Sequence, residues 1–599
     1  MPCHSITEHA YLPVPDVVRG QPFVFGGDPK GNKIVYGQGK TIVVRDLENP
    51  IEGYTYNEHS VATTVAKFAP SGFYICSADV SGKVRIWDTT QEEHAMKYEY
   101  QALSGPIKDL AWSEDSKRIV VGGEGREKFG HAFLWDSGSS VGNLDGHSKP
   151  VNSIDFKQTR PFRVVTASED TDSGFFAGPP FKLDHLNQEH DSFVNAVRFA
   201  PDGTKYITGG ADGRAFIFDG KEGKLIGQVN GDEPAHKGGI YGVAWKKDSS
   251  QFATASADKT VKLWDAEGKL QATFTFPNEV EFQQLGCLWQ GEEILSVGLN
   301  GEMTILDPAN PSEPKRKFQG HSKAITALAV DADAGRFFGG SYDGRVSKVD
   351  AATGKVELFQ GHPTHGITSL AYENGKLIAG SLDDRVTVTA VDGTAFGTES
   401  FACESQPKAV AVASGVIAVA CFNHVMVIKG GAVAATKSVD FEGSAVAVSN
   451  DGSQIAVGTQ AGKIVIYSAS LEEQKTLDAT GAVTCLQFSP DGQYLASGDA
   501  GRNLYVFEAS GDWNLKMSRW KYHTSKINSL AWSPDSQHLA TGSLDTNIIV
   551  WSMADWMKRI TIKGAHPMHD VTQVAWLDNT TLLSGGQDAA FRTFSVTHH

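Results

Sequence analysis

The chain has 599 residues, which is too long for one ordinary domain. Hydrophobic residues make up 40% of it and charged residues 21%, a balance typical of a globular protein. Its 54 basic and 70 acidic side chains give a net charge of −16, which argues against a nucleic-acid ligand because phosphate selects for a basic surface.

The N-terminal segment MPCHSITEHAYLPVPD lacks a basic start followed by an apolar run, so no signal peptide is expected. Residues 409–422 are the most lipid-like stretch, but it is short and contains Ser414 and Gly415. We interpret it as two buried strands and expect no membrane attachment. The cysteines, at positions 3, 76, 287, 403, 421 and 485, show no paired spacing, which favours the reducing cytoplasm.

Residues 235–265 show the basic unit of the chain most completely. Three short strands are predicted there, at 240–245, 251–255 and 260–264, separated by polar turns. Short strands broken by turn residues are typical of an antiparallel meander.

The same unit recurs along the whole chain. Fourteen repeats follow one another at about 42 residues, the length of a four-stranded propeller blade. The residues that end their third strands are Asp46, Asp88, Asp136, Ala177, Asp219, Asp265, Asp307, Asp350, Val391, Lys429, Ser468, Glu508, Ser552 and Ser595. Repeats nine to eleven are assigned from this period alone.

Propellers close with about 4–8 blades, so the sequence predicts an all-β chain of two seven-bladed propellers in tandem. We expect the first at 17–314 and the second at 315–599, with the proline-rich stretch 308–314 as linker. Repeat fourteen ends four residues from the C-terminus and lacks an outer strand. Because an open edge is a liability, we expect Ser5 to Ala10, within the segment 1–16, to complete it.

A second regularity links a His before the first strand to a Ser on the second strand, an Asp in the next turn and a Trp on the third strand. In WD repeats these four side chains form a hydrogen-bonded network. The matching sets are His59, Ser77, Asp79 and Trp87; His236, Ser256, Asp258 and Trp264; and His523, Ser543, Asp545 and Trp551. Partial matches are His147 with Asp170, His190 with Asp212, His321 with Asp343, His362 with Asp383, and His566 with Asp588. Because they recur once per repeat, which chemistry does not need, we interpret them as structural.

No motif indicates catalysis. The glycine-rich segments 37–40 and 122–125 open no helix, no Ser lies in a G-x-S-x-G elbow, and no Cys/His cluster has zinc spacing. We therefore expect a protein that is not an enzyme and has neither metal nor cofactor. A propeller enzyme, which would need a polar cluster in a central channel, stays open as an alternative.

The repeat is interrupted in repeats three to five, and loops on a rigid scaffold usually carry binding residues. Repeat three has a long second hairpin, 123–131, and repeat four departs from the pattern between Glu169 and Lys182. We expect Phe176 to be a core residue, because it occupies the Trp position, and Glu127 and Lys182 to lie on the surface. Phe193 is open to either interpretation.

The doubled seven-repeat plan resembles the actin-interacting protein 1 family, as do the stretches Gly-Arg-Glu-Lys-Phe-Gly-His (125–131) and Gly-Pro-Pro-Phe-Lys (178–182). The resemblance implies a cytoplasmic protein of the actin cytoskeleton that binds actin filaments decorated with ADF/cofilin and promotes their disassembly. It also implies actin- or cofilin-binding roles for Glu127, Glu169, Lys182 and Phe193, whereas Leu183 stands where the family leads us to expect an aromatic residue.

The alternative function is a generic WD-repeat scaffold for another cytosolic complex. In either case we expect a monomer whose partners are proteins, without nucleic acid or membrane.

Overall fold

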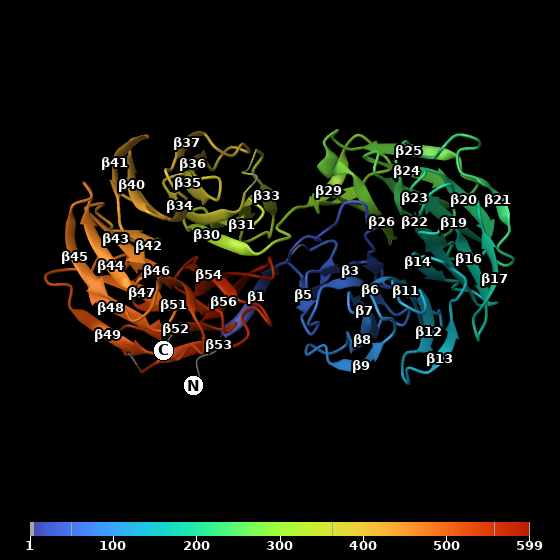
Figure 1. Ribbon diagram of the computed structural model, residues 1–599, viewed down its shortest axis with the longest axis horizontal. Coiled ribbons are helices and arrows are strands. Elements are labelled where there is room, and N and C mark those ends of the chain that lie inside the picture. The colour runs from blue at the N-terminus through green and yellow to red at the C-terminus, as the bar shows by residue number, and fades with distance from the viewer. Residues whose placement is uncertain (1–4, 50, 362, 364, 556, 598–599) are drawn as a thin grey trace. The chain divides into compact units, whose positions relative to one another are not determined.

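The computed structural model describes residues 5–49, 51–361, 363, 365–555 and 557–597, with side chains left undescribed at 5–8, 519 and 520. Within these residues the chain forms strands β1 to β56 and one short 3-10 helix, η1 (Val280–Phe282). The described strands pair antiparallel into fourteen four-stranded sheets. The predicted all-β fold of two seven-bladed propellers is confirmed (Figure 1).

Blades one to seven, four strands each in chain order, form the first propeller. Their strands are β2 (Gly26–Gly27), β3 (Lys33–Gln38), β4 (Thr41–Asp46), β5 (Gly53–Tyr56); β6 (Thr63–Phe68), β7 (Tyr74–Asp79), β8 (Lys83–Asp88), β9 (Met96–Gln101); β10 (Ile107–Trp112), β11 (Arg118–Gly123), β12 (Gly130–Leu134), β13 (Ser140–Asn143); β14 (Val151–Phe156), β15 (Arg163–Ser168), β16 (Ser173–Ala177), β17 (Lys182–Asn187); β18 (Val194–Phe199), β19 (Lys205–Gly210), β20 (Ala215–Asp219), β21 (Leu225–Gln228); β22 (Ile240–Trp245), β23 (Gln251–Ser256), β24 (Thr260–Asp265), β25 (Leu270–Thr275); β26 (Gln284–Gln290), β27 (Glu293–Gly298), β28 (Met303–Leu306) and β29 (Pro314–Phe318).

Blades eight to fourteen form the second propeller. Their strands are β30 (Ile325–Asp331), β31 (Arg336–Ser341), β32 (Val346–Asp350), β33 (Val356–Leu358); β34 (Ile367–Glu373), β35 (Lys376–Ser381), β36 (Arg385–Ala390), β37 (Glu399–Ala402); β38 (Pro407–Ala413), β39 (Val416–Cys421), β40 (His424–Lys429), β41 (Ala432–Ser438); β42 (Gly443–Val448), β43 (Gln454–Thr459), β44 (Lys463–Ser468), β45 (Glu473–Asp478); β46 (Val483–Phe488), β47 (Tyr494–Asp499), β48 (Leu504–Glu508), β49 (Leu515–Trp520); β50 (Ile527–Trp532), β51 (His538–Ser543), β52 (Ile548–Ser552), β53 (Arg559–Ile562); and β54 (Val571–Trp576), β55 (Thr581–Gly586), β56 (Phe591–Val596) with β1 (Ser5–Tyr11).

Burial within a blade follows strand position. In blade six, β23 is buried at five of its six residues, whereas the outer strand β25 is buried at only one of its six. The second strand is covered on both faces by neighbouring blades, so its sequence Gln-Phe-Ala-Thr-Ala-Ser is apolar or small rather than alternating. The outer strand borders solvent and carries polar residues.

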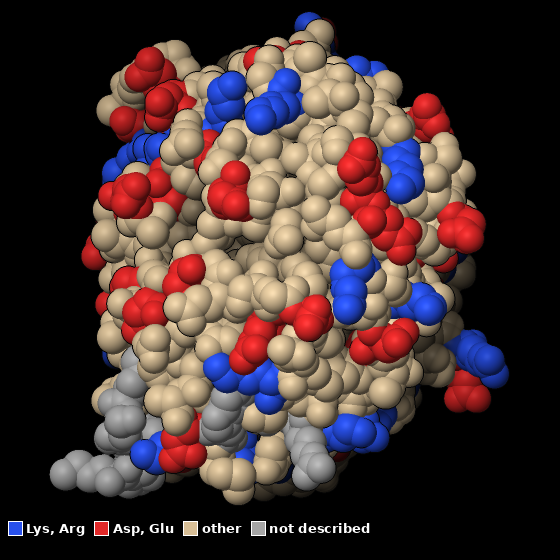
Figure 2. Space-filling view, turned by 90° about the vertical axis from the view of Figure 1, so that its left-hand side faces the viewer, with Lys and Arg blue, Asp and Glu red and all other residues tan. Residues whose placement is uncertain are grey.

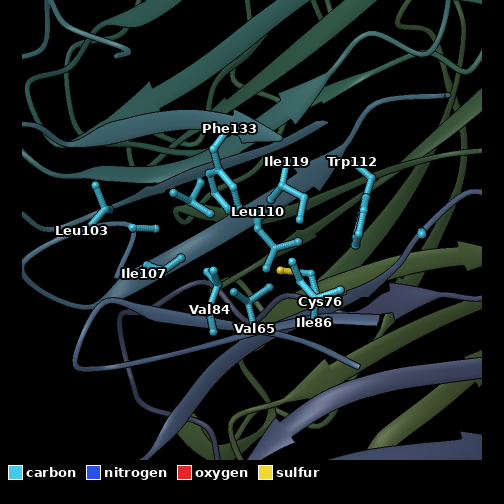
Figure 3. Packing of buried hydrophobic residues seen from close by; sticks show 14 of the residues in the cluster. Val65, Cys76, Val84, Ile86, Leu103, Ile107, Leu110, Trp112, Ile119 and Phe133 are labelled. Atoms are coloured by element: carbon cyan, nitrogen blue, oxygen red, sulfur yellow. The ribbon is translucent and has the colours of Figure 1, made fainter. Parts of the chain in front are cut away.

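Apolar side chains between neighbouring blades make up the core. One cluster joins β6 and β8 of blade two to β10 and β11 of blade three through Val65, Ile86, Leu110, Trp112 and Ile119 (Figure 3). Each of these side chains is buried, and full burial of such a side chain contributes about 1.5–3 kcal/mol. The blades are therefore held to one another chiefly by hydrophobic contacts.

The boundary between the two compact units differs from the expected one. The first unit spans Val14–Gln319, and the second runs from Gly320 onward together with the N-terminal segment that ends at Pro13. The expected break near residue 315 is displaced because β29 pairs with β28 as the outer strand of blade seven. The proline-rich stretch 308–314 thus lies inside that blade, as the loop after β28 and the first residue of β29, and its interpretation as a linker was wrong.

The first propeller closes by packing blade seven against blade one. Phe23 N donates to Leu285 O (2.8 Å), and Gln290 Nε2 donates to Asp28 O and Asp28 Oδ1 (both 2.8 Å). A Cβ at Gly27 would lie 1.8 Å from Gln290 Oε1, so a side chain there would displace the Gln290 amide from this contact. No strand is exchanged between these two sheets in the described chain.

The second propeller closes by strand pairing between the two ends of the chain. β1 pairs antiparallel with β56, from Ser5 opposite Val596 to Tyr11 opposite Phe591. Figure 1 shows β1, in dark blue, beside β56, in red. The strand expected at Ser5 to Ala10 thus supplies the fourth strand of blade fourteen.

The lipid-like stretch 409–422 consists of most of β38, all of β39 and the turn between them, as interpreted from the sequence. Among the described residues, no helix is long and apolar enough to cross a membrane.

Tyr11 joins β1 of blade fourteen to blade eight. It is buried, its hydroxyl donates to Ala351 O (2.8 Å), and its ring lies edge-on to Phe337 at 5.1 Å between centroids. Tyr11→Ala should lower the free energy of unfolding by about 3–5 kcal/mol, as for other buried aromatics. Urea unfolding of the full chain measures this. The matched control is Tyr342→Ala, which removes a side chain that is 65% exposed and should change stability by less than about 0.5 kcal/mol. Equal effects of the two variants would contradict the closure role of β1.

Candidate interaction face

The turns between the second and third strands lie at one end of the blades, which we call the upper face. Backbone hydrogen bonds join each turn to the segment that enters the first strand of the same blade. Glu169 N donates to Pro150 O (3.0 Å), and Ala211 N donates to Phe193 O (2.8 Å). These turns and entry segments therefore share the upper face.

Three of the four predicted binding residues lie on this face of the first propeller. Glu127 is in the β11–β12 loop of blade three, Glu169 is in the β15–β16 turn of blade four, and Phe193 directly precedes β18 of blade five. The three blades are consecutive around the ring, so tertiary structure brings these residues onto neighbouring blades.

Phe193 is an exposed side chain, 45% accessible, whereas Phe175 and Phe176 are core residues, as expected for Phe176. Lys149 Nζ lies 5.6 Å from the centroid of the Phe193 ring. An ammonium over an aromatic face is attracted by about 0.5–1 kcal/mol at exposed sites. Phe193 and Lys149 thus offer an apolar anchor with a positive charge beside it.

Glu169 is not a free carboxylate. Lys108 Nζ donates to Glu169 Oε1 (2.8 Å) and to Asn152 Oδ1 (3.1 Å), and it lies 3.4 Å from Glu124 Oε1. This network joins blades three and four, with Glu169 28% exposed at its side chain. Sequence reasoning missed Lys108, because it lies 61 residues from Glu169 and no local motif marks it.

The loop that carries Glu127 is held at its base. Arg126 N donates to Ser104 Oγ (2.9 Å), and Lys128 Nζ donates to Asn143 Oδ1 (3.3 Å). Burial lowers the pKa of Lys128, although the carboxylates of Asp145 and Glu127 act against that shift. Glu127 itself is exposed, as expected.

Lys182 lies at the opposite end of its hairpin. In the β16–β17 pairing, Ser173 beside the upper turn faces Asn187, whereas Lys182 faces Ala177 at the far end. Lys182 is exposed, as expected, but the structure does not place it with Glu127, Glu169 and Phe193. Its neighbour Leu183 is 37% exposed.

The recurring His and Asp residues hold the upper turns to the entry segments. In blade two, His59 Nδ1 lies 3.0 Å from Asp79 Oδ2, His59 Nε2 lies 2.8 Å from Ser77 Oγ, and Trp87 Nε1 donates to Ser77 Oγ (3.1 Å). All four side chains are buried. Burial would raise the pKa of Asp79, but hydrogen bonds from His59 and Ser81 prevail and lower it to about 2.

The hydroxyl partner differs from the prediction in blades six and thirteen. His236 Nε2 lies 2.7 Å from Thr254 Oγ1, which also accepts from Trp264 Nε1 (2.9 Å). Ser256 instead donates to Gly238 O (3.0 Å). Assigning Ser256 to the His was therefore wrong.

In blade thirteen Thr541 likewise takes the role predicted for Ser543. The physical reason is strand alternation, because Thr254 and Thr541 stand ten residues before the Trp, as Ser77 does, and point toward it. Asp79 stands two residues after its hydroxyl partner, whereas Asp258 stands four after, which explains the shorter His–Asp separation in blade two.

The partial matches use the same kind of network with different hydrogen-bond partners. His147 and His190 bind Asp170 and Asp212 through Nδ1 and a Thr hydroxyl through Nε2. His566 binds Asp588 at 2.8 Å, with Arg592 against both. His321 departs from the prediction, since it binds Ser341 and Ser347 (2.8 Å each), and Ser341 in turn donates to Asp343. His362, proposed to partner Asp383, lies outside the described residues.

A charged cluster lies on the first strands of blades two to five, which line the centre of the first propeller. Asp109 accepts from Lys67 Nζ and Arg198 Nη1 (2.8 Å each), and Asp155 accepts from Phe199 N (2.8 Å). Burial lowers the pKa of Lys67, and the charges of Arg198 and Lys67 outweigh burial to lower that of Asp109. Asp109 is thus paired with cations from two other blades, whereas Asp155 accepts from backbone N–H groups and burial raises its pKa. These contacts tie the blades together.

Comparison with known proteins shows repeats and full-length relatives. The family model "WD domain, G-beta repeat" matches residues 52–88, 138–172, 182–219, 227–265, 312–348, 471–508 and 515–552. The chain is 44% identical over 601 residues to "WD repeat-containing protein 1" of Gallus gallus, and 41% identical over 597 residues to "Actin-interacting protein 1" of Drosophila melanogaster. It is 44% identical over 593 residues to the "66 kDa stress protein" of Physarum polycephalum. Each comparison covers 98% of both chains.

The assignment of Thr254 can be tested directly. Thr254→Val keeps the shape of the side chain but leaves His236 Nε2 and Trp264 Nε1 without their buried partner. An unsatisfied buried group costs about 1–3 kcal/mol, and urea unfolding should show a loss of that size. The control Thr275→Val changes an exposed residue of the same blade and should be neutral within about 0.5 kcal/mol. A neutral Thr254→Val would contradict the network.

The network should also make stability depend on pH. Burial would raise the pKa of Asp545, but the hydrogen bond and charge of His523 prevail and lower it to about 2. An unfolded Asp titrates near 3.9, so this carboxylate stabilises the fold above about pH 4, and the stabilisation is lost as the pH falls toward 2. Asp545→Asn should therefore be less stable than the wild type at pH 7.

The difference between Asp545→Asn and the wild type should shrink as the pH is lowered from about 4 to about 2. Urea unfolding followed by tryptophan fluorescence at several pH values measures it. Asp478→Asn, at a carboxylate whose side chain is 85% exposed, serves as control. A difference that stays constant across this window would show that Asp545 does not titrate there.

Proposed function

Because this chain belongs to the family of actin-interacting protein 1 and WD repeat-containing protein 1, we propose that it binds actin filaments and promotes, with ADF/cofilin, the disassembly of cofilin-decorated filaments. The observation that carries the proposal is the 41% identity to Actin-interacting protein 1 of Drosophila melanogaster, which extends over 98% of both chains. Similarity of that extent includes both propellers.

We place the filament contact on the upper face of the first propeller, at blades three to five. Phe193 supplies an exposed aromatic anchor, and Glu127 and Lys149 supply charges of both signs around it. Aromatic side chains dominate the binding energy of protein interfaces, whereas rim charges set register and association rate. Glu169 acts within this surface as the partner of Lys108, which it holds in place.

The protein acts as a binding module rather than an enzyme. The sequence contains no catalytic motif. In the central charged cluster, Asp109 is paired with Lys67 and Arg198, and Asp155 is held by the backbone N–H groups of Phe156 and Phe199. A catalytic cluster would need a group free to exchange protons or charge with a substrate.

The surface chemistry fits protein partners in the cytoplasm. Figure 2 shows acidic and basic side chains interspersed over the face in view, without the single-sign basic field that nucleic acid requires. With a net charge of −16 the chain repels phosphate backbones. We propose that it works as a monomer on the actin cytoskeleton, without nucleic acid or membrane.

The second candidate is a WD-repeat scaffold for another complex, which the same blades would support. Co-sedimentation with actin filaments, with and without cofilin, separates the two. Pelleting that increases with cofilin decoration, together with loss of polymer, supports the proposal. Failure to pellet with decorated filaments would favour the scaffold.

Two substitutions on the upper face test its location. Phe193→Ala and Glu127→Lys should each weaken binding to cofilin-decorated filaments, by about tenfold or more for Phe193 if it is a hot spot. Because both side chains are exposed, the melting temperature should stay near that of the wild type. Filament co-sedimentation and the rate of polymer loss give the readout.

Lys463→Glu, an exposed residue of the second propeller, is the matched charge-reversal control and should retain activity. Lys182→Glu asks separately whether the contact reaches the far end of blade four. Full activity of the double variant Glu127→Lys, Phe193→Ala would overturn the placement on the upper face.

A further inference from the structure

Blade ten carries a different set of side chains where other blades place the His–Asp network. Cys403 N donates to Asp384 O (2.8 Å), as His236 N donates to Gly213 O (3.0 Å), so Cys403 stands at the His position. Cys421 is the last residue of β39, as Ser256 is of β23. His424 is the first residue of β40 and stands where Thr260 begins β24. The upper turn and the entry segment of blade ten thus meet through two thiols and an imidazole.

These three side chains form a compact set of ligand atoms. Both sulfurs and an imidazole nitrogen lie within 4.8 Å of one another. Cys421 and His424 are buried and Cys403 is half-buried. No spacing in the sequence indicated a metal site, because Cys403 lies in the segment that enters β38 and Cys421 ends β39, and only the fold of the blade brings them together.

The two ring nitrogens of His424 differ in their hydrogen bonding. Its Nδ1 lies 3.0 Å from Ser405 Oγ, whereas its Nε2 is buried and has no hydrogen-bond partner among the described residues. A buried polar atom left unpaired costs about 1–3 kcal/mol. Metal-binding histidines commonly have one ring nitrogen on the metal and the other hydrogen-bonded to the protein. Ser405 supplies that second contact here.

We propose that Cys403, Cys421 and His424 bind a zinc ion at the upper face of blade ten. Two thiolates and one imidazole are a recognised zinc ligand set, with a fourth position left for water. Sulfurs on one zinc, each at about 2.3 Å, lie roughly 3.8 Å apart, so the cluster needs to contract by about an ångström at most. The fourth position is reached past Cys403, the least buried of the three.

The surroundings favour a cation. The carboxylates of Asp384 and Glu404 interact electrostatically with the Cys421 thiol, and Glu404 also interacts with His424. The ion would tie the turn of β39 and β40 to the segment that enters β38, which is the task of the His–Asp pair elsewhere. Zinc should accordingly stabilise the folded chain, since a ligand that binds the native state alone raises its stability.

The test uses the full chain, purified under a phosphine reductant and stripped of metal with a chelator. Titration with Co²⁺ as a spectroscopic probe should give a thiolate charge-transfer band that saturates at one equivalent, and Zn²⁺ should displace it. Zinc should also raise the melting temperature. Cys403→Ser, Cys421→Ser and His424→Gln should each abolish the stoichiometric band, and Ser405→Ala should weaken zinc binding by about 10–100-fold.

Cys485→Ser is the matched control, because Cys485 is a free thiol of the same propeller outside the cluster, and it should bind like the wild type. Circular dichroism checks that each variant is folded. If Cys421→Ser does not fold, Cys403→Ser tests the proposal in its place, because Cys403 is a half-buried residue of the entry segment. Three results would each overturn the proposal. The first is the absence of a cobalt band in the reduced wild type, and the second is a band that survives the loss of Cys403. The third is a Cys403–Cys421 disulfide that persists under reductant and leaves no metal bound.

Discussion

Burial of blade against blade is the constraint on which this structure depends. A four-stranded sheet whose second strand is buried almost throughout, such as β23, has two faces that need cover, and each neighbouring blade covers one of them. The first and last blades of each propeller would expose an apolar face unless the ring closed. Closure is therefore a condition of stability for every blade, including those far from the point of closure.

The two propellers meet this condition in different ways. In the first, Gln290 and the backbone of Phe23 join blade seven to blade one, and all four strands of both blades come from continuous sequence. In the second, blade fourteen takes its outer strand from β1, so the N-terminus is tied to β56 by a full ladder of backbone pairs. The second solution also protects the edge of β56, which would otherwise be open to association with other chains.

The hydrogen-bonded networks hold the loops of the upper face in place. Each joins the turn after the second strand to the segment that enters the first strand. Glu169 and Phe193 therefore lie beside turns that the buried pairs His147–Asp170 and His190–Asp212 hold in place. The partners of the His differ among blades. Most networks contain one Ser or Thr hydroxyl, His321 has two serines and His566 has an arginine. Blade ten instead has two thiols with His424. A common geometry thus accommodates different chemistry at one place in the repeat.

The fold class and the number of blades could be predicted from the sequence, because a period of about 42 residues and the recurring turns are local signals. The exposure of Glu127 and Lys182 was predicted as well. The strand expected near the N-terminus is also present, as β1 beside β56. Tertiary structure alone decided that Lys108 holds Glu169, that Lys182 lies at the opposite end of its hairpin, and that Thr254 rather than Ser256 meets His236. It also decided that Cys403, Cys421 and His424 share one site. These facts depend on strand register, on which way alternate side chains point, and on contacts between residues far apart in the chain, none of which a period in the sequence can specify.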